Sequence, residues 1–156
     1  RLTHLLARAA GCRGMVAGQV VDMESEGKKI DFPTLEYIHT RKTGALILAS
    51  VQMGALVGGA DDSGYQALTD YGRAAGLAFQ IADDILDVVG DQELLGKDVG
   101  SDQQRGKATY PALLGLEEAR QRAREMRDRA LQALEPLGER AEPLRLLAHF
   151  IVDRSF

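Results

Sequence analysis

The chain has 156 residues, 45% of them hydrophobic, which is enough for one domain with a sizeable core. Its formal net charge is −4 and no basic stripe accumulates along it, so we expect no nucleic-acid partner. The single cysteine excludes an internal disulfide and fits a reducing compartment, which favours a cytoplasmic location. The longest uncharged run, residues 44–60, falls short of a bilayer span, so we do not expect an integral membrane protein.

The chain opens on Arg1 rather than on methionine, and Leu2, Leu5 and Leu6 already follow a helical spacing. A chain does not normally begin inside a helix that faces a core. We therefore expect residues 1–156 to be the C-terminal part of a longer protein.

The hydrophobic pattern has a helical period throughout and shows no alternation typical of strands, so the sequence predicts an all-α fold. Asp61 and Asp62 are expected to cap a helix rather than to bind metal. The long, glycine-punctuated connection at residues 90–107 is of a kind that is often functional. The expected helices cover residues 2–10, 14–25, 32–57, 109–134 and 143–156, and the helix that carries the acidic stretch is expected over about 71–89, with caps at 61–63.

Residues 79–87 form the strongest candidate site. At about 100° per residue, Gln80, Asp83, Asp84 and Asp87 fall on one narrow face of a helix whose other side is apolar. Carboxylates so placed repel one another, and a cation would offset that repulsion. Oxygen ligands without histidine or thiolate favour Mg²⁺, with Mn²⁺ as a substitute. The alternative interpretation is a solvated acidic face.

Three lysines are candidates for binding an anion near these carboxylates. Lys42 has apolar neighbours three and four positions away, so it either snorkels to the surface or points into a cavity at an anion. Lys97 and Lys107 follow glycines in the loop after the acidic helix, but Ala108 stands where a P-loop needs serine or threonine. Carboxylate-bound Mg²⁺ surrounded by lysines is a usual way to bind a di- or triphosphate.

The remaining reactive residue types suggest no site of their own. His4, His39 and His149 lack the spacing of metal ligands. His39 lies on the Lys42 face and is a candidate neighbour of the site, but the preferred interpretation is a core or surface residue. Cys12 has no evident base partner and is interpreted as a packing residue.

Four motifs in order resemble the trans-type isoprenyl diphosphate synthases, most closely the bacterial farnesyl diphosphate synthases. The first two are residues 14–22 and 37–46, which include Gln19 and the Lys42-Thr43 pair. The third is the Phe79-Gln80-x-x-Asp83-Asp84-x-x-Asp87 stretch, similar to the second aspartate-rich motif of that family. The fourth is the following loop through residues 109–111.

The resemblance implies an isoprenoid-synthase-type helical bundle and a short-chain prenyltransferase. In that reaction an allylic diphosphate ionises while Mg²⁺ and basic side chains stabilise the departing diphosphate. Isopentenyl diphosphate then attacks and loses a proton, giving farnesyl or geranylgeranyl diphosphate. By the same resemblance, Asp83, Asp84 and Asp87 bind Mg²⁺ directly or through water. Lys42 and Lys97 act on the diphosphate, and the expected substrate-binding residues are Gln19, Thr43, Phe79, Gln80, Lys107 and Arg154.

The first aspartate-rich motif of the family is absent from the chain, as are the residues that bind isopentenyl diphosphate and set product length. Residues 1–156 are therefore expected to be the C-terminal half of one prenyltransferase domain, inactive alone and homodimeric in the full-length form. Its exposed apolar faces should bind the missing N-terminal half or a second copy. The alternatives are a naturally short, non-catalytic subunit, a related terpene-forming enzyme and a longer-chain synthase.

Overall fold

The computed structural model describes residues 1–95 and 108–154, with side chains described for 1–89 and 108–154. All the regular structure in these residues is helical, as the sequence predicted. In chain order the elements are α1 (Leu2–Ala10), α2 (Met15–Ser25), α3 (Phe32–His39), the π-helical turn η1 (Thr40–Gly44), α4 (Ala45–Val57), α5 (Asp62–Leu95), α7 (Tyr110–Leu114), α8 (Leu116–Ala133), the 3₁₀ helix η2 (Glu135–Ala141) and α9 (Glu142–Asp153).

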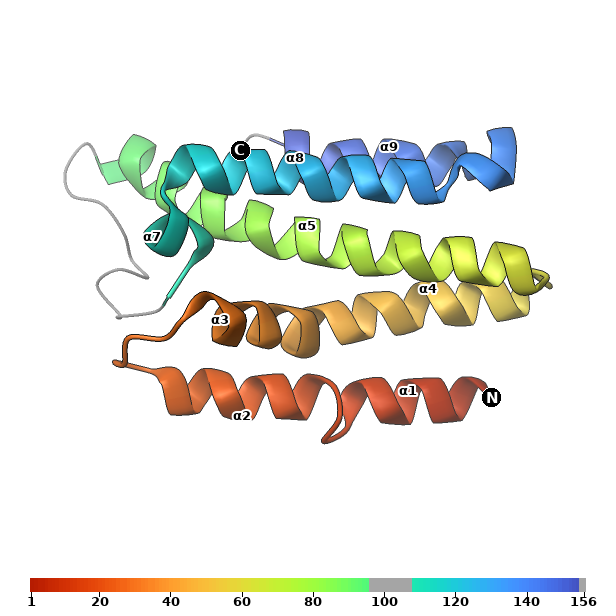
Figure 1. The fold of residues 1–156 in the computed structure, drawn as a ribbon, viewed down its shortest axis with the longest axis horizontal. Helices are drawn as coiled ribbons and strands as arrows, with labels where there is room; N and C mark the ends of the chain where they lie inside the picture. The colour runs from red at the N-terminus through yellow and green to blue at the C-terminus, as the bar shows by residue number, and fades with distance from the viewer. Residues whose placement is uncertain (96–107, 155–156) are drawn as a thin grey trace.

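The helices lie roughly side by side, with α5 through the middle of the molecule (Figure 1). Helices α1 and α2 follow one another along one edge, and α3, η1 and α4 form the next row. On its other side α5 packs mainly against α8, with α9 beside it. The acidic helix of the sequence is thus the central helix of the bundle.

Two hydrophobic clusters along α5 hold the bundle together. The cluster that we call the pocket-end core consists of Leu35, Ala78, Ile81, Tyr110, Ala119, Ala123 and Met126. The distal core, nearer the start of α5, consists of Tyr71, Ala74, Ala75, Ala130, Leu134, Ala141 and Ala148. Because so many of these residues are alanines, the helix backbones can approach closely.

The expected helix at residues 32–57 has the predicted extent, but the π-helical turn η1 interrupts it at Lys42. Such turns are rare and often lie at functional sites. Gly18 of α2 lies against this turn, and a Cβ there would lie 2.3 Å from the Lys42 backbone nitrogen. The close approach of α2 to η1 therefore requires glycine at position 18.

Two further predictions on the helices, and the prediction on Cys12, need correction. Helix α5 continues to Leu95, so the first part of the expected loop at residues 90–107 is helical. The expected helix at residues 109–134 is broken at Gly115, whose φ of 87° favours glycine. Cys12 is exposed rather than packed. The capping prediction is correct for Asp61, whose Oδ1 accepts a hydrogen bond from the Gly64 backbone N–H at 2.7 Å.

Among the described residues, no helix combines the length and hydropathy needed to cross a membrane.

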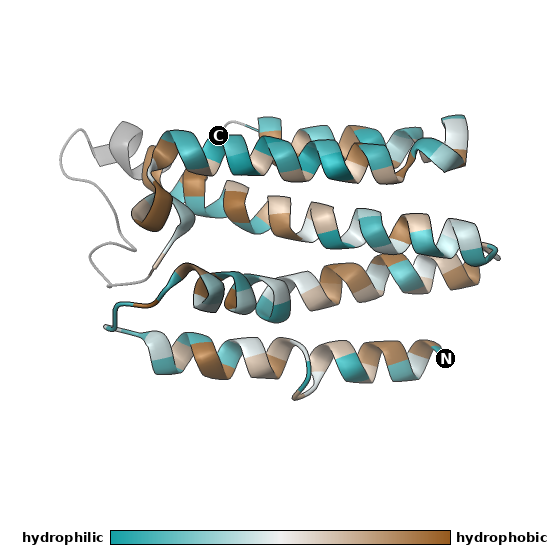
Figure 2. Ribbon diagram, in the orientation of Figure 1, coloured by the Kyte–Doolittle hydropathy of each residue, from teal (hydrophilic) through white to brown (hydrophobic). Residues whose placement is uncertain are grey.

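Apolar side chains remain at the surface on two sides of the bundle, as expected. Figure 2 shows hydrophobic positions along α1, α2 and α9. The exposed large hydrophobic residues of these helices are Leu2, Leu6, Val16, Val20, Met23, Leu146, Leu147 and Phe150.

Candidate active site

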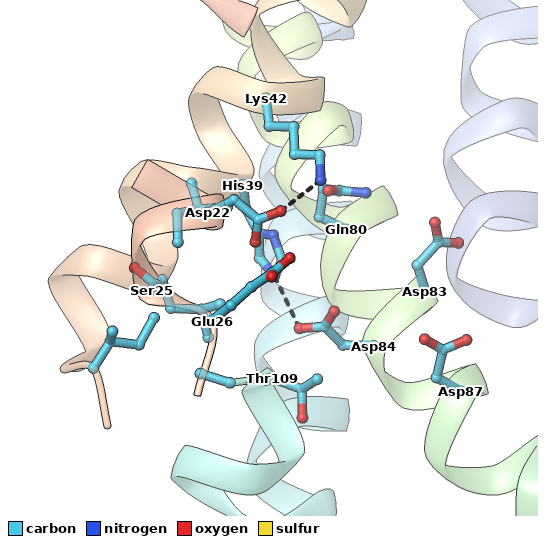
Figure 3. A pocket seen from close by; sticks show the side chains of 14 residues that line it. Asp22, Ser25, Glu26, His39, Lys42, Gln80, Asp83, Asp84, Asp87 and Thr109 are labelled. Atoms are coloured by element: carbon cyan, nitrogen blue, oxygen red, sulfur yellow. Dashed lines mark hydrogen bonds and ion pairs between the residues drawn. The ribbon is translucent and has the colours of Figure 1, made fainter. Parts of the chain in front are cut away.

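A cavity of about 180 Å³ opens between α2, α3, η1, α5 and the segment that leads into α7. Its lining combines carboxylates from α2 and α5 with Lys42 from η1 (Figure 3). The lining residues are Asp22, Ser25, Glu26, Ile30, Leu35, Ile38, His39, Lys42, Gln80, Asp83, Asp84, Asp87, Ala108 and Thr109.

Asp84 contacts two elements outside α5. His39 Nε2 lies 2.9 Å from Asp84 Oδ2, and the backbone N–H of Tyr110 donates to the same oxygen, also at 2.9 Å. The Asp84 side chain is 13% exposed. Figure 3 shows Asp84 turned toward His39, while Asp83 and Asp87 lie together to the right of Asp84, farther from His39. The three aspartates therefore do not present equivalent side chains to the cavity.

His39 is buried, as the core interpretation predicted, and it also lines the cavity, where the sequence indicated no role for it. His39 is 8% exposed, and its ring stacks on Tyr110 with centroids 5.6 Å apart and planes inclined by 7°. The Tyr110 ring in turn meets the edge of Phe32 at 5.2 Å. The sequence signal was the position of His39 on the Lys42 face, but its partner Asp84 lies 45 residues away.

The hydroxyl of Tyr110 is buried without a hydrogen-bond partner among the described residues. Burial raises the pKa of Tyr110 far above its usual value, and the nearby charge of Glu36 raises it further. The nearby charge of Arg122 acts in the opposite direction. Tyr110 therefore stays neutral over the whole physiological range and contributes a rigid ring beneath His39.

Lys42 does not simply snorkel into solvent. Its Nζ donates to Asp22 Oδ2 at 2.7 Å, and both residues line the cavity. The Lys42 side chain is 35% exposed and that of Asp22 is 19% exposed. In Figure 3 Lys42 and Gln80 lie at one end of the cavity and Asp87 at the other. The ammonium is thus held at the cavity by a carboxylate, and it has further N–H groups that can donate to a bound anion.

Asp83 forms an ion pair with Arg154, which follows the end of α9. The guanidinium also lies over the Phe79 ring, 4.9 Å from the ring centroid, an arrangement that favours cation–π attraction. Arg154 Nε is buried without a partner among the described residues. The Asp83 side chain is nevertheless 44% exposed, so solvent screens this ion pair.

Of the residues proposed from the sequence, Lys42, Gln80, Asp83, Asp84 and Asp87 line the cavity. The other described ones do not line it; they are the half-buried Gln19, Thr43, Phe79 and Arg154. Their assignment as substrate-binding residues stays a prediction. Lys97 and Lys107 lie outside the described residues.

The donor set fits a hydrated divalent cation better than a closed metal cage. Within the described part of the chain, no three histidine, cysteine, aspartate or glutamate residues form a ligand cluster. Asp83, Asp84 and Asp87 all line one cavity. One water molecule needs about 10–15 Å³ of cavity volume, so a cavity of about 180 Å³ has room for several waters around an ion. Mg²⁺ typically keeps several waters and takes only one or two carboxylates.

The chain matches known proteins over most of its length. A family model described as polyprenyl synthetase matches residues 1–141. Farnesyl diphosphate synthase of Escherichia coli is 51% identical over 156 residues, which cover 96% of this chain and 52% of that protein. The chloroplastic geranylgeranyl pyrophosphate synthase of Catharanthus roseus is 44% identical over 157 residues, covering 99% of this chain and 44% of that protein.

A similar solved structure is a geranyltransferase from Helicobacter pylori, complexed with magnesium and isoprenyl diphosphate. It superposes with a TM-score of 0.76 at 32% sequence identity, and the match covers 97% of this chain and 50% of that one. The chain spans about half the length of the curated relatives that it matches.

Proposed function

The chain belongs to the polyprenyl synthetase family, and from that membership we propose that the whole protein is a short-chain prenyltransferase. It condenses an allylic diphosphate with isopentenyl diphosphate to give farnesyl or geranylgeranyl diphosphate. Residues 1–156 form the C-terminal half of its single all-α domain. One of these relatives is named a farnesyl and the other a geranylgeranyl synthase, which supports keeping both products in the proposal.

The observation that carries this proposal is the meeting of Lys42 with Asp83, Asp84 and Asp87 at one cavity. These residues come from two helical segments about 40 positions apart, and only the fold unites them. Carboxylates that can hold a divalent cation, with an ammonium opposite, match the needs of a diphosphate leaving group. A solvated acidic face would not require a lysine and a buried histidine around it.

Mg²⁺, when bound, neutralises the charge that develops on the departing diphosphate. Asp83, Asp84 and Asp87 would hold this ion directly or through water, and Mn²⁺ would substitute for it. In the free protein, the hydrogen bond to Asp22 keeps the Lys42 ammonium at the cavity. When substrate binds, Lys42 would donate to the diphosphate. Further contacts with substrate are proposed for Gln19, Thr43, Phe79, Gln80, Lys97, Lys107 and Arg154.

The exposed apolar side chains of α1, α2 and α9 support an association of this chain with further protein surface. We propose two associations for the full-length protein: packing of an N-terminal half against this one, and a homodimer. The protein is proposed to act in the cytoplasm, a reducing compartment that its single cysteine suits.

The test is an assay of chain elongation with an allylic diphosphate, isotopically labelled isopentenyl diphosphate and Mg²⁺. Lys42→Gln should lower the rate at least tenfold, because an unneutralised leaving group raises the barrier. Lys28→Gln, an exposed lysine of the loop after α2, serves as the matched control and should have no effect.

Native mass spectrometry on the same sample tells which chains are present. An inactive sample that contains the complementary half would contradict the proposed reaction and favour a non-catalytic subunit.

A further inference from the structure

His39 contacts the site but has no role in the chemistry proposed so far. We propose that His39 is a positioning residue: it fixes one oxygen of Asp84 so that the other is presented to the bound cation. This inference rests on the proposed function, because it concerns the same cavity and its cation.

The hydrogen bonds of Asp84 are distributed unevenly between its two oxygens. Both recorded contacts, from His39 Nε2 and from the Tyr110 backbone N–H, go to Oδ2. An ionised carboxylate can only accept, so His39 must carry its proton on Nε2 in this contact. Two donors on one oxygen fix the plane of the carboxylate, and Oδ1 has no recorded partner within the described part of the chain. A cation at this residue would therefore bind through Oδ1.

The fold holds His39 itself in place. It is the last residue of α3, directly before the π-helical turn that carries Lys42. Its ring lies nearly parallel to that of Tyr110, which is fully buried. Rotating His39 away from Asp84 would break this stacking as well as the hydrogen bond. The carboxylate is thus oriented by a side chain with little freedom of its own.

His149 forms a second histidine–aspartate contact, with Asp153, at the surface of the molecule. Its Nδ1 lies 3.5 Å from Asp153 Oδ2, and both side chains are about half exposed. That pair lies on α9 and contributes nothing to the cavity lining. It provides a matched control for the loss of a histidine–aspartate contact.

The experiment measures the affinity of the purified protein for Mn²⁺ in the presence of inorganic diphosphate, from the electron paramagnetic resonance signal of free Mn²⁺. His39→Leu and His39→Asn remove the donor at the Nε2 position, while the longer amide of His39→Gln can restore it. Loss of a partner that orients a metal ligand typically weakens metal binding about 10- to 100-fold. We expect that loss in the leucine and asparagine variants, recovery in the glutamine variant and no change in His149→Leu.

A thermal unfolding curve of each variant separates positioning from a purely structural role. If His39→Leu does not fold, the Mn²⁺ affinities of His39→Asn and His39→Gln are compared instead. Both side chains end in an amide, and only glutamine is long enough to reach Asp84. Equal Mn²⁺ affinity in the asparagine variant and the wild type would overturn the inference and leave the proposed function standing. A wild-type protein that binds no Mn²⁺ with diphosphate would overturn both.

Discussion

The two ends of α5 use the same helix for different purposes. In the distal core the buried Tyr71 donates its hydroxyl to the Leu144 backbone oxygen at 3.0 Å, and the surrounding residues are mostly alanine. At the pocket end the buried Tyr110 leaves its hydroxyl without a partner among the described residues, and its neighbours His39 and Asp84 are polar. The distal end therefore contributes mainly stability, while the pocket end keeps polar groups where a ligand can contact them.

The largest expected effect comes from opening a void in the distal core. Leu134 is fully buried there. Leu134→Ala should lower the free energy of unfolding by about 2–5 kcal/mol, as measured by chemical denaturation. Diphosphate and Mn²⁺ binding by the folded protein should not change. If binding weakened in the same variant, the separation of the two ends would be wrong.

A smaller loss is expected where α2 meets the π-helical turn. Gly18→Ala would place a methyl group 2.3 Å from the Lys42 backbone nitrogen, and such overpacking costs about 1–3 kcal/mol. Because the clash lies at Lys42, diphosphate affinity should fall as well.

The matched control for this prediction is Gly54→Ala in α4, where the added methyl group meets nothing within 4 Å. That variant should gain about 0.5–1 kcal/mol, because alanine loses less backbone freedom in a helix than glycine. Equal destabilisation by both substitutions would show that the close approach at Gly18 is unimportant.

The two buried tyrosines give a direct comparison of the two ends. Tyr71→Phe removes a hydroxyl that donates to Leu144 and should cost about 0.5–1.5 kcal/mol. Tyr110→Phe removes a hydroxyl that has no partner among the described residues, so the free energy of unfolding should stay unchanged or rise. Urea denaturation of the two variants in parallel is the measurement, and a greater loss for Tyr110→Phe would reverse the comparison.

The smallest effect is expected in the pH dependence of stability at alkaline pH. Burial raises the pKa of both Tyr71 and Tyr110, and in the unfolded chain both return to about 10. The folded state thus binds more protons above that value, and stability falls as the pH rises beyond about 10. Tyr110→Phe should make this decline shallower. An unchanged slope in unfolding curves between pH 9 and 11 would contradict the assignment.

The sequence by itself determined the helical class and the acidic face of α5, because both depend on spacing within a single helix. The all-α prediction is confirmed, and Asp83, Asp84 and Asp87 line one cavity as their helical spacing suggested. The capping role of Asp61 was also predictable, since its partner Gly64 lies three positions away. Interactions of this range follow from local geometry alone.

Only the tertiary structure decided which partner each charged side chain has. Asp84 meets His39 across 45 positions, and Asp83 meets Arg154 across 71. The π-helical turn at Lys42 likewise lies where Gly18 of α2 packs against it, and this packing leaves no periodic trace in the sequence. The residue types of the site were visible in the chain, but their roles were not, because a role depends on distances that the whole bundle sets.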